Sequence, residues 1–207
     1  MHIPIAQPSL GNEESDAVLT VLASGMIAQG PVTAAFEEEF AAYCGIPHAV
    51  AVSNGTTALH AALLATGVGP GDEVVVPAFT FFATASSVSM CGARPVFADV
   101  DAATATIDPA DVLAKVTPKT KAVIGVHLYG QPCDAGAIRE ICDDKGLVFI
   151  EDAAQAHGAT YQGKKTGSLG DLACFSFYAT KNLATGEGGM VTTASDEYDA
   201  RLRRIIN

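Results

Sequence analysis

The stretch that decides the fold begins Ala122-Val123-Ile124-Gly125-Val126 and ends Leu147-Val148-Phe149-Ile150-Glu151-Asp152. Both ends are short, apolar and rich in β-branched residues, which predicts buried strands over residues 122–126 and 147–150. The segment between them predicts a helix over residues 134–144. Two strands joined through a helix are expected to lie in one sheet and to run parallel.

The same alternation of strand and helix continues on both sides of this stretch. Further strands are predicted over residues 49–52, 73–76, 95–98, 172–177 and 189–193, and the last two are close enough in sequence to pair antiparallel. Helices are predicted over residues 12–24, 34–44, 57–65, 80–90, 109–116 and 196–206. Thr33 is expected to cap the second helix, and Gly25 and Gly45 to close the first two. The predicted fold class is α/β, with three layers (α/β/α) and a mostly parallel sheet.

Composition and charge exclude several classes of protein. Of the 207 residues, 49% are hydrophobic and 17% are charged, which suits one α/β domain with a buried core. The net charge of -11 argues against nucleic acid as a partner, because binding phosphates needs clustered Lys and Arg. We expect neither a signal peptide nor a membrane segment, since no basic start precedes an apolar run of the length that either needs.

The cysteines indicate the redox environment in which the protein works. They are spread over the chain without a CxxC pair, at Cys44, Cys91, Cys133, Cys142 and Cys174. An odd number of scattered cysteines favours reduced thiols in a cytoplasmic protein over a disulfide framework or a zinc site.

Two segments at predicted strand ends carry polar side chains. Ser53-Asn54-Gly55-Thr56-Thr57 opens a helix, so its backbone N–H groups and hydroxyls could hold a phosphate, or its polar residues could simply cap the helix. Glu151 and Asp152 follow an apolar strand, where a carboxylate must be paired. That pairing is a helix cap, a structural salt bridge, or a contact to a positively charged ring nitrogen.

A single lysine stands out for its surroundings. Lys181 lies between the apolar strand that ends near Phe177 and the glycine-rich run Gly186-Glu187-Gly188-Gly189. A loop lysine is usually solvated, but a desolvated one has a lowered pKa and becomes an amine nucleophile. The glycines would let the backbone approach a ligand closely.

Several motifs, in this order, resemble those of the DegT/DnrJ/EryC1/StrS group of sugar aminotransferases. These enzymes use pyridoxal 5′-phosphate (PLP) on the large domain of fold type I. The resemblance covers essentially the whole chain. The motifs that carry it are Ser53-Asn54-Gly55-Thr56-Thr57-Ala58-Leu59, Pro77-Ala78-Phe79-Thr80-Phe81, Glu151-Asp152-Ala153-Ala154-Gln155-Ala156-His157-Gly158-Ala159, and the segment from Phe175 through Lys181-Asn182 to Gly189.

The resemblance implies a role for each matching residue. Lys181 would form the Schiff base with the cofactor and move the proton between Cα and C4′. Asp152 would pair with the pyridine nitrogen, Gln155 would lie near the 3-hydroxyl, and Phe81 would stack on the ring. The phosphate would be bound by Thr56, the backbone of Thr57, and Ser176. A related branch with histidine at the lysine position acts as a dehydratase, so Lys181 favours transamination.

The resemblance also implies substrates and partners. An amino acid, glutamate, would give its amino group to the keto group of a nucleotide-linked sugar. Gly186-Glu187-Gly188-Gly189 is similar to the run in members that act at the 4-position. Family members work as homodimers and continue into a smaller C-terminal domain. We therefore interpret residues 1–207 as the N-terminal segment plus the PLP-binding large domain, without the small domain.

Two other interpretations stay open from the sequence. The predicted helix over residues 196–206 runs to the end of the chain without a closing turn, as in a truncated chain. The protein would then be a non-catalytic remnant that binds PLP or a partner chain. The other alternative is a different fold-type I PLP enzyme, such as a desulfurase or a lyase.

Overall fold

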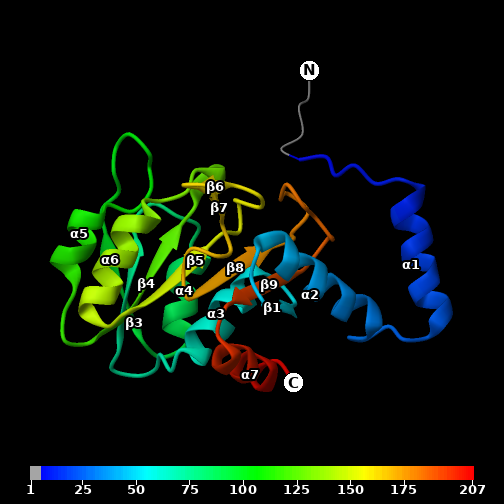
Figure 1. Cartoon of the computed structure of the whole chain (residues 1–207), viewed down its shortest axis with the longest axis horizontal. Coiled ribbons are helices and arrows are strands. Elements are labelled where there is room, and N and C mark those ends of the chain that lie inside the picture. Colours follow the sequence, from blue (N-terminus) through cyan, green and yellow to red (C-terminus); the bar gives the residue numbers. More distant parts are fainter. Residues whose placement is uncertain (1–5) are drawn as a thin grey trace.

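The computed structural model describes residues 6–207, which fold around a seven-stranded sheet of order β1-β9-β8-β5-β4-β2-β3 (Figure 1). Its strands are β1 (His48–Val52), β2 (Glu73–Pro77), β3 (Arg94–Ala98), β4 (Thr120–Val126), β5 (Val148–Asp152), β8 (Leu172–Ser176) and β9 (Gly189–Thr193). The prediction of no signal peptide rests partly on residues 1–5, which lie outside the described residues.

The sheet is mostly parallel, as predicted. β5 lies at its centre and pairs in parallel with β4, where Ile150 is opposite Ile124, and with β8, where Ile150 is opposite Leu172. β9 pairs antiparallel with both β8 and β1. The predicted antiparallel pairing of the last two strands is therefore confirmed.

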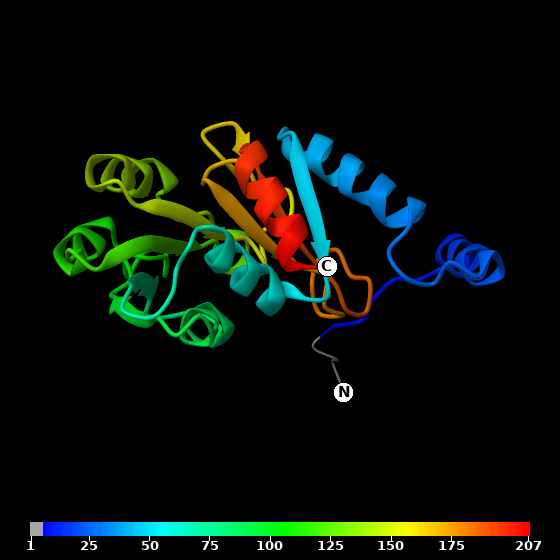
Figure 2. The same ribbon diagram turned by 90° about the horizontal axis from the view of Figure 1, so that it is seen from below.

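Helices cover both faces of the sheet, so the predicted three-layer α/β/α architecture is confirmed (Figure 2). One face packs against α3 (Gly55–Ala65), α4 (Ala83–Met90) and α7 (Asp196–Ile205). The other face packs against α2 (Pro31–Cys44), α5 (Pro109–Lys115) and α6 (Ala135–Lys145). α1 (Asn12–Ser24) has no buried residue and stands apart from these layers in both views.

Several predicted boundaries were wrong. α2 begins at Pro31 with Gly30 as its N-cap, so Thr33 is not the cap; proline at the first helical position has its φ preset for a helix start. α4 begins at Ala83, which leaves residues 80–82 in a loop. β5 extends through Asp152, so the two acids belong to the strand.

Other local features were predicted correctly or not at all. Gly25 and Gly45 close their helices with φ of 72° and 75°, as expected for left-handed C-caps. The short helix η1 (Leu128–Gly130) and the hairpin of β6 (Thr160–Tyr161) and β7 (Lys164–Lys165) were not predicted. All five cysteines are free and buried. In residues 6–207, no helix has the length and apolar character needed to cross a membrane.

Candidate active site

The predicted site residues gather at one edge of the sheet. Asp152 ends β5 and Ser176 ends β8, while the chain leaving β1 enters α3 at Gly55. Because β9 runs the opposite way, the loop over residues 177–188, which carries Lys181, also returns to this edge. Ligands of parallel α/β sheets bind beyond the carboxyl ends of the strands, and this is that edge.

Asp152 is a buried acid without a cationic partner. Its side chain is on the face covered by α4, and the residue is 6% exposed. Thr84 donates a hydrogen bond to its Oδ2 at 2.8 Å, and the Ala154 N–H donates to its Oδ1 at 3.3 Å. Within residues 6–207 it forms no ion pair. Burial raises the pKa of Asp152, although these two hydrogen bonds oppose the shift, so a ligand cation beside it would be favourable.

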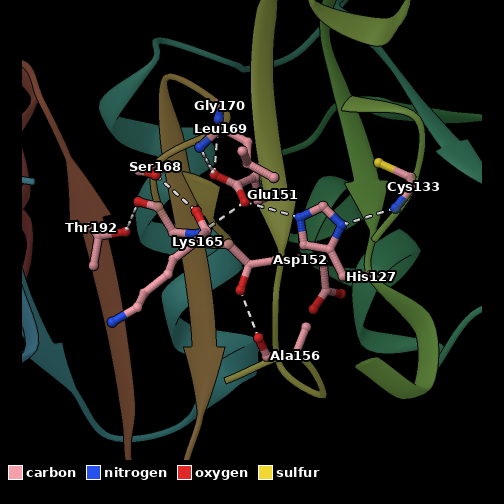
Figure 3. A network of polar contacts seen from close by, with 12 residues as sticks. His127, Cys133, Glu151, Asp152, Ala156, Lys165, Ser168, Leu169, Gly170 and Thr192 are labelled. Atoms are coloured by element: carbon pink, nitrogen blue, oxygen red, sulfur yellow. Dashed lines mark hydrogen bonds and ion pairs between the residues drawn. The ribbon is translucent and has the colours of Figure 1, made fainter. Parts of the chain in front are cut away.

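Glu151 points to the opposite face and is fully satisfied there. Its carboxylate contacts His127 Nε2 at 2.9 Å and accepts backbone N–H bonds from Gly167, Leu169 and Gly170 at 2.7–2.9 Å (Figure 3). The Cys133 N–H donates to His127 Nδ1, so the imidazole proton lies on Nε2 and faces Glu151. The structural interpretation therefore holds for Glu151, which leaves Asp152 as the acid available to a ligand.

The start of α3 forms the second part of the site. Asn54 caps the helix, and its Oδ1 accepts the Thr57 N–H at 2.8 Å. The N–H groups of Gly55 and Thr56 have no acceptor in the part of the chain that the structure describes. A side chain at Gly55 would come within 2.7 Å of Ser176 Cβ, so glycine lets this helix start lie directly against Ser176. Free N–H groups beside a hydroxyl at a helix N-terminus suit a phosphate.

Thr57 fits its predicted role less directly. Its N–H is engaged by Asn54, and its hydroxyl lies 3.1 Å from both Asn54 Oδ1 and Ser53 Oγ. Its side chain lines a groove of about 1180 Å³ whose lining includes neither Asp152 nor Lys181. A phosphate contact from the Thr57 N–H would have to share that group with Asn54.

The lysine loop is tied to the segment that follows β5. His157 Nδ1 lies 2.7 Å from Asn182 Oδ1, and Asn182 Nδ2 donates back to the His157 carbonyl at 3.2 Å. Lys181, next to Asn182, is half-buried, and its Nζ makes no hydrogen bond or ion pair among residues 6–207. The His157–Asn182 pair therefore anchors the loop that joins β8 to β9, and this loop carries the Lys181 amine.

Gln155 and Phe81 complete the predicted set. The Tyr129 N–H donates to Gln155 Oε1 at 2.8 Å, which orients the amide and leaves its Nε2 as a donor for a ligand oxygen. Tyr129 holds this N–H in place with a left-handed backbone, φ 52°. Phe81 is 60% exposed, with its ring centroid 4.5 Å from that of Phe82. Neither Thr84 nor Tyr129 was found by sequence reasoning, since one looks like an ordinary helix residue and the other acts through its backbone.

The α/β fold with a mostly parallel seven-stranded sheet is that of PLP-dependent aminotransferases of fold type I. The carboxyl edge of this sheet carries a buried acid without an ion pair and a helix start with free N–H groups, and ligands of such sheets bind at this edge. The chain belongs to the DegT/DnrJ/EryC1/StrS aminotransferase family, whose model matches residues 8–207. The cofactor of this family is PLP, and the site fits it: Asp152 for a cationic ring nitrogen, and the α3 start with Ser176 for a phosphate.

Several named proteins are similar to this chain in sequence and in structure. GDP-perosamine synthase of Caulobacter vibrioides is 52% identical over 99% of this chain and 55% of its own length. The structure of DesV from S. venezuelae with a ketimine intermediate matches with a TM-score of 0.92 at 47% identity, over 95% of this chain and 53% of that one. A sugar aminotransferase from Streptococcus pneumoniae, in its PLP form, matches with a TM-score of 0.94 at 33% identity, over 98% and 57%. The chain spans about half the length of the relatives it matches.

Proposed function

We propose that this chain is the cofactor-binding part of an aminotransferase that moves an amino group from an amino acid to a keto group of a nucleotide-linked sugar. The observation that carries the proposal is that two groups without a partner lie at the same edge of the sheet: Asp152, a buried acid that forms no ion pair, and Lys181, on the loop that joins β8 to β9. The name of the relative from Caulobacter vibrioides supports a nucleotide-linked sugar as the acceptor. We propose glutamate as the amino donor and the 4-position as the site of amination.

The residues at the sheet edge would divide the work as follows. PLP, when bound, supplies an electron sink for the substrate carbon that loses its proton. Lys181 would hold the cofactor covalently and then carry that proton on its Nζ. Asp152 would accept a hydrogen bond from the ring nitrogen and keep it protonated. Thr56 and Ser176 would bind the phosphate.

Two side chains would position the ring. Gln155 would donate from Nε2 to the 3-hydroxyl oxygen, because its Oε1 is already engaged by the Tyr129 N–H. Phe81 would cover one face of the ring. These contacts exclude water and fix the ring plane, which makes the direction of proton transfer specific.

We also propose that the protein works as a homodimer in the cytoplasm. The rim of the site carries exposed aromatic side chains, with Phe82 at 70% and Tyr129 at 79% exposure. Exposed aromatic side chains near a site are typical of surfaces that bind a partner. Five free cysteines suit a reducing compartment.

A turnover assay tests the function. The protein, loaded with PLP, is mixed with glutamate and a nucleotide-linked 4-keto sugar, and the 3-keto isomer serves as the matched acceptor. We expect 2-oxoglutarate and an amino sugar from the 4-keto substrate, and none with the Lys181→Ala variant. Cofactor binding without turnover would favour the non-catalytic remnant. Release of sulfur or loss of a leaving group from an amino acid would favour a desulfurase or a lyase.

A further inference from the structure

The hydroxyl of Thr84 contacts Asp152, the acid of the site. Thr84 is in the first turn of α4, is 0% exposed, and its Oγ1 is 2.8 Å from Asp152 Oδ2. The hydroxyl of Thr80 lies 2.9 Å from the same Oγ1. A carboxylate can only accept, so Thr84 donates to Asp152 and in turn accepts from Thr80. The two hydroxyls therefore form a directed chain that ends on the carboxylate.

A buried threonine in a helix usually has a simpler explanation. Its hydroxyl donates to the carbonyl one turn earlier in the same helix. Thr84 does not do this: its helix begins only at Ala83, and the acceptor of its hydroxyl is Asp152, 68 residues away. The hydroxyl is therefore committed to the acid and not to the stability of its own helix.

The chain of hydroxyls joins the acid to the loop that carries the aromatic residue of the site. Thr80 is adjacent to Phe81, in the loop between β2 and α4. Asp152 is on β5, in the centre of the sheet, and its second oxygen is held only by the 3.3 Å bond from Ala154. The direction of the carboxylate therefore depends mainly on Thr84.

We propose that Thr84 is a positioning residue of the cofactor site, whose hydroxyl stabilises the Asp152 carboxylate and aims it at a ring nitrogen, with Thr80 fixing the direction of that hydroxyl. The effect on Asp152 belongs to this chain alone, and only its consequence for PLP rests on the proposed function. Burial favours the neutral acid and raises its pKa, while the Thr84 bond opposes the shift by stabilising the anion. The Ala154 N–H bond and the nearby His127 and Lys181 side chains act in the same direction as Thr84. A neutral Asp152 would not hold a ring nitrogen protonated.

The first measurement needs no cofactor. The carboxyl ¹³C signal of Asp152 is titrated in the apoprotein for wild type and for Thr84→Val, which keeps the shape and removes the hydroxyl. We expect Thr84→Val to raise the pKa of Asp152, and Thr84→Ser to restore the wild-type titration. An Asp152 titration that is the same in wild type and Thr84→Val overturns the proposal.

The second measurement uses PLP labelled with ¹⁵N in the ring, whose chemical shift reports protonation of that nitrogen. We expect Thr84→Val to move the shift toward the unprotonated value and to weaken PLP binding about tenfold, the loss expected for one hydrogen bond to a charged group. Thr80→Val, which leaves the Thr84 hydroxyl in place, should act in the same direction but more weakly. If Thr84→Val does not fold, Thr80→Val alone still tests the proposal.

The outcomes separate the two proposals. Wild-type protein that binds no PLP contradicts the proposed function, while the apoprotein titration still decides the role of Thr84. Wild type and both valine variants with the same ring shift and the same affinity overturn the positioning role, even though PLP binds.

Discussion

Glu151 and Asp152 are neighbours on β5, both shielded from solvent, yet their surroundings differ sharply. Glu151 has four donors: the His127 ring and three backbone N–H groups (Figure 3). Asp152 has one short bond, from Thr84, one long bond, from Ala154, and no ion pair within residues 6–207. Burial alone does not mark a functional acid. A buried acid whose charge is incompletely compensated is the better candidate, because a ligand can supply what is missing.

The largest loss of stability is expected from a substitution of Glu151, whose charge is compensated by its four donors. Glu151→Gln keeps the shape but replaces one acceptor oxygen with an NH₂ group. Depending on the orientation of the amide, either His127 and the Gly167 N–H or the Leu169 and Gly170 N–H groups lose their acceptor. We expect the free energy of unfolding to fall by roughly 3 kcal/mol, the loss expected when two buried donors are left without an acceptor. Urea denaturation measures it, with exposed Glu140→Gln on α6 as the control. A loss below about 1 kcal/mol would show that the four bonds contribute little.

Asp152→Asn, in contrast to Glu151→Gln, should hardly change stability but should weaken PLP binding. The amide keeps the Thr84 bond and removes a buried charge, so we expect a change in unfolding free energy within about 0.5 kcal/mol or a small gain. PLP affinity should fall about a hundredfold, close to 2.7 kcal/mol, because the ring nitrogen loses its anion. Titration of PLP absorbance with both proteins checks this. If Asp152→Asn destabilised the apoprotein as much as Glu151→Gln, the contrast between the two acids would be lost.

The pH dependence of stability tests the same contrast between Glu151 and Asp152. Burial raises the pKa of Asp152 in the folded protein above its ordinary value of 3.8. The folded state then binds this proton more tightly than the unfolded chain, so stability falls as pH rises from the unfolded pKa through the folded one. Asp152→Asn removes that fall, so the stability of the variant relative to wild type should increase from about pH 4 upward.

Urea midpoints of both apoproteins between about pH 4 and 8 measure this difference. A difference that stays constant over that interval, or shrinks with rising pH, would mean that Asp152 is already compensated by a group within the protein.

The smallest effect concerns the loop that faces the uncompensated acid. Asn182→Ala removes both bonds to His157, and we expect the free energy of unfolding to fall by only about 1 kcal/mol, because Asn182 is exposed to solvent. Amide hydrogen exchange should rise over residues 177–188, while Thr180→Ala, in the same loop, should leave it unchanged. Equal exchange in both variants would show that the His157–Asn182 pair does not hold the lysine loop.

The fold was largely predictable because buried parallel strands are short apolar runs with a clear boundary. The errors have local causes. Gly30 and Pro31 start α2, although Thr33 looked like the cap. Residues 80–82 match the helical pattern of the residues that follow them, but they lie in the loop before α4. The two-residue strands β6 and β7 are too short to carry any periodicity.

The site was predictable only in part. The two-residue period of a strand places Glu151 and Asp152 on opposite faces, but which face meets the ligand depends on the packing of α4 and of the loop over residues 167–170. Lys181 stood out mainly through the family resemblance. Thr84 and Tyr129 had no signal, since their contributions are a long-range hydroxyl contact and a backbone N–H.

The central claim is that Lys181 and Asp152 form a PLP site at the carboxyl edge of the sheet. The most direct test is to incubate the protein with PLP, reduce it with borohydride, and locate the cofactor by peptide mass spectrometry. We predict one reduced adduct on Lys181, with a much lower yield for Asp152→Asn and none on that peptide for Lys181→Ala. No adduct, or an adduct spread over surface lysines such as Lys119 and Lys164, would contradict the account.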